Sequence, residues 1–90
     1  MTPTTYLRRI DDQLVEALQY TGDNLDEVRA MVGAGYRVTV TDAGGLTLTR
    51  EHPQELVDVS AWDWVVRDGQ RAYAMRSFAF RGHCRAVPIE

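Results

Sequence analysis

The dipeptide Asp68-Gly69 constrains the fold of this chain more than any other feature, because it separates two apolar runs, residues 64–66 and 72–75. Asp-Gly readily adopts the left-handed turn that joins two antiparallel strands with the twist of a hairpin. The segment therefore predicts a β-hairpin, and with it an antiparallel sheet.

A second hairpin is predicted by the alternation of apolar and polar residues in segments 36–41 and 46–50, with threonines on the outer face. Pro53 is expected to end the second strand in a loop over residues 51–55, and residues 56–60 are expected to form a short strand. The residues expected to face the core are Tyr36, Val38, Val40, Leu46 and Leu48.

A short helix of about nine residues is predicted after Asn24. Asn24 is the expected N-cap, and Glu27, three residues later, completes the pattern of a capping box. Gly33 or Gly35 is expected to supply the left-handed residue that ends the helix. The apolar face consists of Leu25, Val28, Met31 and Val32.

Residues 7–20 fit two structures, a helix and a strand. The helix would be amphipathic, with an apolar face made of Leu7, Ile10, Leu14 and Leu18. A strand over residues 13–20 would have two faces, with Leu14, Leu18 and Tyr20 on one and Val15, Ala17 and Gln19 on the other. Periodicity alone leaves both structures open.

The tail from residue 77 is expected to begin as a loop or a single helical turn and to end as a strand closed by Pro88. Together these segments predict an α+β fold, in which a mostly antiparallel β-sheet of about five strands packs against one short α-helix. A chain of 90 residues has room for one core, so residues 13–90 are expected to form a single domain. Residues 1–12 are expected to be a mobile N-terminal segment.

Composition places the chain among globular proteins of a reducing compartment. A hydrophobic content of 44% with 26% charged residues excludes a disordered chain. Cys84 is the single cysteine, which excludes an internal disulfide. No apolar run reaches the length of a membrane span, and the N-terminal residues lack the apolar stretch of a signal peptide. The expected location is therefore the cytoplasm, with no membrane contact.

Charge is distributed unevenly along the chain. Residues 11–63 hold eleven acids and three arginines, a balance of −8, whereas residues 67–85 hold five arginines and one acid, a balance of +4. This asymmetry fits an acidic or phosphorylated partner, and it equally fits two halves that face each other when folded. All ten basic residues are arginine, which codon bias in a GC-rich genome explains, so their abundance is not evidence for anion binding.

No pattern of catalytic or metal-binding residues stands out. His83 and Cys84 are adjacent, so on a strand their side chains would point to opposite faces and could not act as base and nucleophile. A metal site would need His52 to converge with these two residues from a distant segment. The glycines of segment 33–35 follow a helix rather than precede one, which predicts a helix end and not a phosphate loop. No enzymatic activity, metal or cofactor is expected.

The segment "EALQYTGDNLDEV" at residues 16–28, with the later "DWVVRDG" at 63–69 and Tyr73, resembles a family of small uncharacterised proteins of tailed phages and prophages. The pattern of that family favours a strand over residues 13–20. Where the family has Gly-Asp-Trp, this chain has Trp62 in place of the glycine, and Met75 stands at the family's cysteine position. The resemblance implies a bacterial host cell and no particular chemistry.

Aromatic and arginine side chains make up the candidate binding site. Trp64 is expected in the core, whereas Trp62 precedes the strand and is either a core residue or an exposed anchor. Arg67 and Arg71 are expected at the exposed end of the hairpin. The full set of candidate partner- or ligand-binding residues is Trp62, Arg67, Arg71, Tyr73, Arg76, Phe78 and Arg81.

The function expected from these features is that of a non-catalytic phage or prophage accessory protein that binds a bacterial host protein, in host takeover or counter-defence. One alternative is a protein that sequesters a phosphorylated small molecule, such as a nucleotide signal, with Arg76 and Arg81. Another is a structural or assembly component of the virion. Nucleic acid is disfavoured by the net charge of −3 and the acidic half. The tail arginines are expected to pair with acids, within the chain or across a homo-oligomer.

Overall fold

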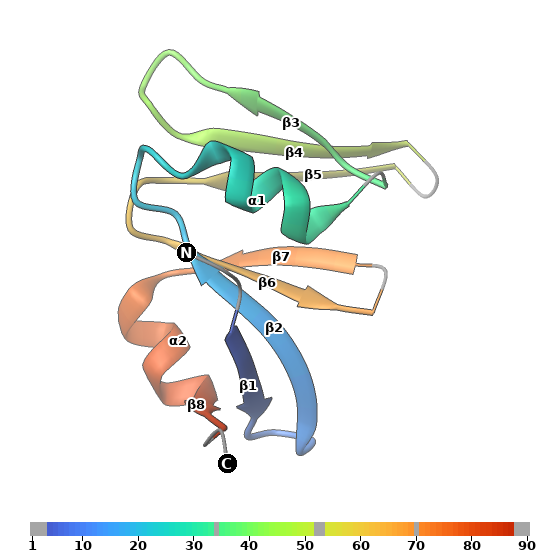
Figure 1. Ribbon diagram of the computed structural model, residues 1–90, viewed down its shortest axis with the longest axis vertical. Helices are drawn as coiled ribbons and strands as arrows, with labels where there is room; N and C mark the ends of the chain where they lie inside the picture. The colour runs from blue at the N-terminus through green and yellow to red at the C-terminus, as the bar shows by residue number, and fades with distance from the viewer. Residues whose placement is uncertain (1–3, 34, 52–53, 70, 88–90) are drawn as a thin grey trace.

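A five-stranded antiparallel sheet forms the lower half of the molecule in Figure 1, a computed structural model that describes residues 4–33, 35–51, 54–69 and 71–87. The strands lie in the order β7-β6-β2-β1-β8, so the N-terminal hairpin sits between the Asp68-Gly69 hairpin and the tail. The strands are β1 (Thr4–Arg8), β2 (Gln13–Gln19), β6 (Trp64–Asp68), β7 (Arg71–Met75) and β8 (Cys84–Ala86).

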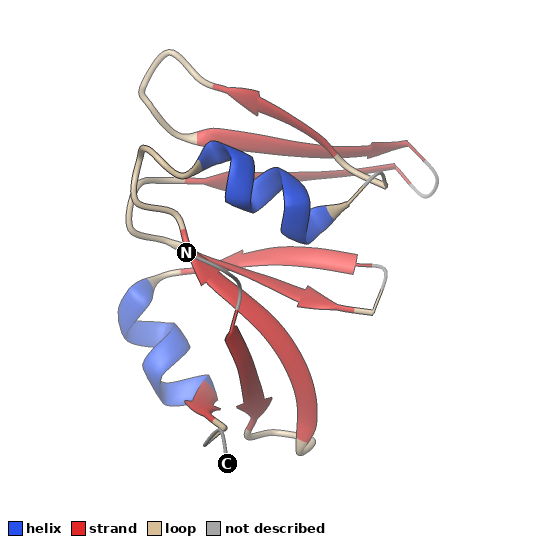
Figure 2. Ribbon diagram, in the orientation of Figure 1, coloured by secondary structure: helices blue, strands red, loops and turns tan. Residues whose placement is uncertain are grey.

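A second, three-stranded antiparallel sheet lies above the first, with α1 (Leu25–Val32) beside it and α2 (Ser77–His83) along the lower sheet (Figure 2). Its strands are β3 (Arg37–Val40), β4 (Leu46–Glu51) and β5 (Gln54–Val59), in the order β3-β4-β5. The expected α+β class, dominated by antiparallel sheet, is confirmed. The described residues form eight strands in two sheets, where about five strands in one sheet were expected, and the helical turn expected near residue 78 is a second helix.

Residues 13–19 form a strand, so of the two structures left open the strand is observed. The apolar run fits a helix as well because β2 is covered on both of its faces near its end, at Ala17 and Leu18, which removes the simple alternation of a half-exposed strand there. Leu18 and Tyr20 belong to one core cluster, and Val15 and Ala17 belong to the other.

The larger core cluster lies between α1, the three-stranded sheet and one face of the five-stranded sheet. Its members include the expected inward residues of the second hairpin, with Leu46 and Leu48 buried completely. Val40 is an exception: at 57% exposure it lies outside the core, at the end of β3, which is an edge strand of the three-stranded sheet. The buried members are Leu18, Tyr20, Val28, Met31, Val32, Tyr36, Val38, Leu46, Leu48, Val59, Val65 and Ala72.

The smaller core cluster fills the opposite face of the five-stranded sheet, under α2. Phe80 of α2 stacks on Trp64 with ring centroids 4.1 Å apart and planes 3° apart, and Tyr6 meets both rings edge-on. Trp64 is half-buried and packs against this cluster, as expected for a core residue. Stacked and edge-on aromatic pairs of this kind stabilise a contact beyond their buried area.

The N-terminal segment 1–12, expected to lie apart from the domain, contains strand β1 and therefore needs correction. β1 pairs with β2 on one side and with β8 on the other. Arg8 at its end donates hydrogen bonds to Asp11, to Asp68 at 2.7 Å and to the Tyr73 hydroxyl at 3.2 Å. These bonds link the N-terminal hairpin to the β6–β7 hairpin, so residues 4–8 belong to the sheet.

Helix α1 begins after Asn24 and ends at Gly33, which has a φ of +73°. The expected capping by the Asn24 side chain is wrong. Its Oδ1 instead accepts a hydrogen bond from the Thr21 amide, and its Nδ2 donates to the Gln19 carbonyl. Asn24 therefore fixes the chain between β2 and the helix rather than the first helical turn.

The loop expected over residues 51–55 is shorter in the structure. β4 runs to Glu51 and β5 begins at Gln54, because the two strands pair as a hairpin through Glu51 and Gln54. The stop expected at Pro53 and the closure expected at Pro88 fall on residues outside the described ranges.

Candidate functional site

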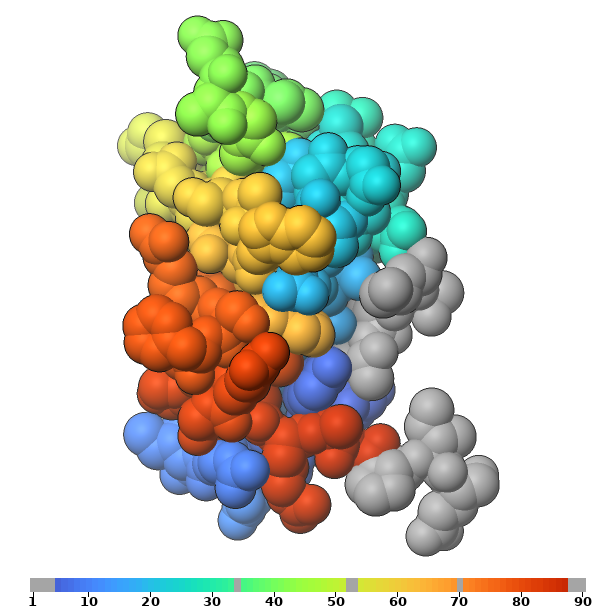
Figure 3. All heavy atoms as spheres, turned by 90° about the vertical axis from the view of Figure 1, so that its left-hand side faces the viewer, coloured from blue at the N-terminus to red at the C-terminus, as the bar shows by residue number. Residues whose placement is uncertain are grey.

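Four of the candidate residues meet beside the N-terminal end of α2, and we call the area formed by Trp62, Arg76, Phe78 and Arg81 the α2 surface. They line an open hollow of about 440 Å³ together with Ala61, Asp63 and Ser77. Trp62 comes from the β5–β6 loop, Arg76 from the residue before α2, and the other two from α2 itself. In Figure 3 the loop, in gold, and the helix, in orange, lie next to each other on one face.

Trp62 is the most unusual residue of the α2 surface, since it is 60% exposed and has a φ of +74°. Its amide donates a hydrogen bond to the Tyr20 carbonyl, while the Tyr20 amide donates one to the Asp63 carbonyl. Trp62 and Asp63 therefore both lie opposite the single residue Tyr20. This is the arrangement of a β-bulge, in which glycine is favoured at the left-handed position. This chain instead holds a bulky side chain in a strained backbone conformation at this position.

The loop that presents Trp62 is held by side chains as well as by backbone. The Gln19 side-chain amide donates to the Trp62 carbonyl at 3.0 Å. The Asp63 carboxylate is buried and accepts a hydrogen bond from the Ser60 amide at 3.0 Å. The indole is thus carried on a fixed loop, which lowers the entropy cost of using it in a contact.

Helix α2 turns two residues outward because Phe80 occupies its inner face. Phe78 is 81% exposed, and Arg81, three residues later, lies on the same side of the helix and is also exposed. Phe78 and Trp62 are two large exposed aromatic residues beside the same hollow. Exposed apolar side chains that cluster in this way are typical of a surface that binds a partner.

The charge of the α2 surface is positive on balance. Arg76 Nε lies 3.9 Å from the Asp63 carboxylate, but the Arg76 side chain remains 70% exposed. Among the described residues, none forms an ion pair or hydrogen bond with the Arg81 side chain. Two exposed guanidinium groups and one buried carboxylate therefore border two exposed aromatic rings.

The remaining three candidates lie elsewhere and serve the fold. Arg67 is half-buried and donates to the carbonyls of Gly69 and of Met31 at the end of α1. Arg71 is exposed at the hairpin end and forms an ion pair of 2.8 Å with Glu55 of β5. Tyr73 is half-buried in the smaller core cluster and accepts a hydrogen bond from Arg8.

Gln19 helps to hold Trp62 in place, although it is not among the candidate site residues expected from the sequence. It is a polar residue at the end of an apolar strand, and nothing in its sequence context distinguishes it from a solvated glutamine. Only the pairing of β2 with β6 brings it to Trp62.

The groups with possible chemical reactivity do not converge. His83 is exposed at the end of α2, where its Nδ1 lies 2.7 Å from the Ala79 carbonyl. Cys84 is buried in β8, and burial raises the pKa of its thiol. Within the described part of the chain, no three His, Cys, Asp or Glu side chains gather where they could hold a metal ion. His52, the third residue weighed as a metal ligand, is outside that part.

Comparisons with protein-family models, with curated proteins and with solved structures found no match to this chain. Of the two helices in the described ranges, neither is long and apolar enough to cross a bilayer.

Proposed function

We propose that this chain is a non-catalytic binding protein that docks onto another protein through the α2 surface. The observation that carries the proposal is Trp62, an exposed indole held at positive φ at a bulge position that favours glycine. Strain of this kind costs about 1–3 kcal/mol and persists where a function requires the side chain.

The composition of the α2 surface supports a protein partner. Tryptophan and arginine are enriched among the residues that contribute most to binding free energy, and aromatic residues are enriched at interfaces generally. The hollow between Trp62 and Phe78 is wide and open, which suits a protruding side chain of a partner. Arg76 and Arg81 favour a partner whose apolar contact is surrounded by acids.

The resemblance to tailed-phage proteins supplies the context of the proposal. In that context the partner is a protein of the bacterial host, met in the host cytoplasm during takeover or counter-defence. The chain acts by occupying a surface of that protein rather than by modifying it.

The test is affinity capture from a bacterial lysate with the full chain and its Trp62→Gly and Phe78→Ala variants. Glycine suits the positive φ at position 62, so the first variant removes the indole and leaves the loop conformation in place. A partner of the α2 surface is expected to be captured by the wild type and reduced at least about tenfold by each variant.

Leu56→Ala is the matched control, because Leu56 is 66% exposed on β5, away from the α2 surface. It is expected to capture the same partner as the wild type. A partner that both α2-surface variants retain at full level would contradict the proposal.

A second candidate function is the sequestration of a phosphorylated small molecule. It is favoured by the presence of two guanidinium groups and two aromatic rings around one hollow, which matches a phosphate and a stacked base. It ranks second because the hollow is open and the Asp63 carboxylate lies 3.9 Å from Arg76. Bound nucleotide would raise the melting temperature of the wild type but not of Arg81→Glu, whereas inorganic phosphate alone would raise neither.

A further inference from the structure

The face of the five-stranded sheet opposite α2 is covered only in part. Leu18, Val65 and Ala72 lie on this face under α1 and the three-stranded sheet and are almost completely buried. Leu14 lies on the same face of β2, four residues before Leu18, and is 62% exposed. The cover therefore ends partway along β2, as the free lower right side of β2 in Figure 1 shows.

The strand register shows which residues lie on the uncovered part of this face, which we call the open face. In one row across the sheet, Leu14 of β2 is opposite Leu7 of β1, which is opposite Arg85 of β8. In the next row, Glu16 lies between Thr5 of β1 and Arg67 of β6. The residues of the open face are thus Thr5, Leu7, Leu14, Glu16, Arg67 and Arg85.

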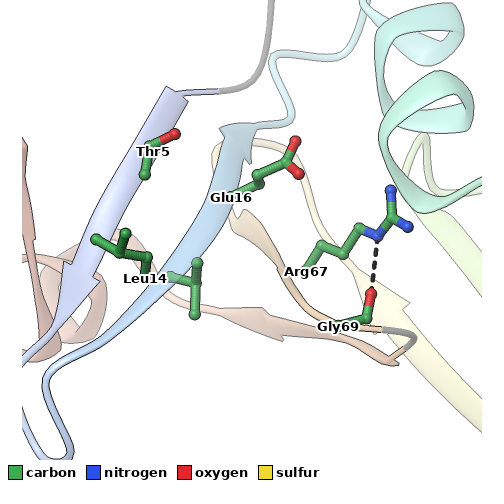
Figure 4. Close-up of a pocket in the computed structure, with 6 residues that line it drawn as sticks. Thr5, Leu14, Glu16, Arg67 and Gly69 are labelled. Atoms are coloured by element: carbon green, nitrogen blue, oxygen red, sulfur yellow. Dashed lines mark hydrogen bonds between the residues drawn. The ribbon is translucent and has the colours of Figure 1, made fainter. Parts of the chain in front are cut away.

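A shallow hollow of about 420 Å³ lies on the open face, bordered by Leu14, Glu16 and Arg67 among others. Figure 4 shows that the Arg67 guanidinium points towards α1 and not towards Glu16. It donates there to the Met31 carbonyl and to Gly69. Glu16 and Arg85 are both exposed, and neither forms an ion pair with another residue in the described ranges.

We propose that the open face is where two copies of this chain pair, sheet against sheet, about a two-fold axis. A two-fold axis brings each residue of a surface against a second residue of the same surface, so the surface must be complementary to itself. The open face meets this condition, because it carries an exposed acid, Glu16, and an exposed base, Arg85, on opposite sides of two leucines.

The register gives the geometry of the pairing. Arg85 and Glu16 are two strands and one row apart, on a diagonal across the sheet. Consider a two-fold axis that is parallel to the sheet and crosses this diagonal at its midpoint and at a right angle. This axis places Arg85 of one copy over Glu16 of the other. The same axis passes close to Leu14, so Leu14 and Leu7 of the two copies meet at the centre, at the spacing of about 10 Å usual for packed sheets.

A second copy fits this face better than an acidic partner does. The α2 surface carries exposed arginines that favour acids, whereas the exposed charges of the open face are of both signs. The two surfaces lie on opposite faces of the sheet, so pairing leaves both α2 surfaces free. The inference therefore stands whether or not the proposed function of the α2 surface is correct.

Sedimentation velocity of the full chain over a range of concentrations tests the pairing. The wild type is expected to form a dimer, and Leu14→Glu is expected to weaken the dimer by at least about a hundredfold, since it buries two unpaired carboxylates. Leu56→Glu is the control, because it adds the same charge at an equally exposed leucine of the other sheet. A wild type that stays monomeric at every concentration, or a control that dissociates as fully as Leu14→Glu, would overturn the proposal.

A charge exchange provides a second test that does not depend on the leucine. Glu16→Arg and Arg85→Glu are each expected to weaken the dimer about tenfold or more through like charges across the interface. The double variant exchanges the two charges and is expected to recover most of the lost affinity. Circular dichroism verifies that each variant is folded. Folded single variants with unchanged affinity, or a double variant as weak as the singles, would refute the proposed register.

Discussion

At the scale of single residues, the backbone of Trp62 has a conformation that favours glycine, although the residue carries a large side chain. A φ of +74° disfavours every residue with a Cβ atom, and a non-glycine residue there loses roughly 1–2 kcal/mol. The bonds from Tyr20 and Gln19 hold the backbone in this conformation. The strain is therefore local and can be measured by substitution.

We expect Trp62→Gly to be more stable than Trp62→Ala by about 1 kcal/mol, measured as the free energy of unfolding in urea. At ordinary positions the order is the reverse, since glycine loses more conformational entropy on folding. Comparing the two small residues removes the contribution of the lost indole. If alanine proves equal or superior to glycine at this position, the backbone of Trp62 is not strained.

At the scale of elements, α2 is attached to the sheet by one side chain and exposes another. Phe80 is 3% exposed between Trp64 and Tyr6, whereas Phe78 is 81% exposed. The two residues have the same side chain and lie two residues apart on the same helix. They therefore allow the effect of burial to be compared directly.

We expect Phe80→Ala to lower the free energy of unfolding by about 3–5 kcal/mol, because it opens a cavity among stacked rings. Phe78→Ala is expected to change it by no more than about 0.5 kcal/mol. Urea unfolding followed by tryptophan fluorescence measures both, and the fluorescence of Trp64 reports directly on the lost stacking. Equal losses in the two variants would mean that α2 packs against the sheet differently.

At the scale of the whole molecule, the two sheets are joined by polar contacts as well as by the larger core cluster. The Tyr36 hydroxyl accepts a hydrogen bond from the Ala72 amide of β7. Glu55 of β5 pairs with Arg71 of β7 at 2.8 Å and lies 3.5 Å from Arg50. The hydrogen bond from Arg71 lowers the pKa of the Glu55 carboxyl. The basic tail and the acidic half of the chain also contact each other through two ion pairs, Arg71–Glu55 and Arg76–Asp63.

The lowered pKa of Glu55 predicts how stability depends on pH. Since the folded pKa lies below the usual 4.5, the pair stabilises the fold above that pH and its contribution is lost as pH falls through the folded value. The pKa of Asp11 is lowered in the same way by Arg8, so acid weakens both contacts together.

We expect Glu55→Gln to be less stable than the wild type at about pH 7, and the difference to shrink as the pH falls below 4.5 and through the lowered pKa of Glu55. Urea unfolding at a series of pH values measures this difference. The effect is small because the pair is open to solvent. A difference that stays constant across the acidic range would show that Glu55 acts through packing and not through its charge.

The local elements could be predicted because their signals are local. Asp68-Gly69 is a turn in any context, and Gly69 has the expected left-handed φ of +64°. The alternation before and after residues 42–45 likewise specifies a hairpin, and α1 follows from its apolar face and its glycine end. The α+β class follows from these elements together.

Tertiary structure alone decided which residues meet. Arg67, Arg71, Arg76 and Arg81 look alike in the sequence, yet only the last two lie beside Trp62, because the first two sit in the β6–β7 hairpin facing α1 and β5. Pairing with the neighbouring β2 and with the distant β8 made β1 part of the sheet. Local propensity acts over a few residues, whereas burial depends on what the rest of the chain places against each face.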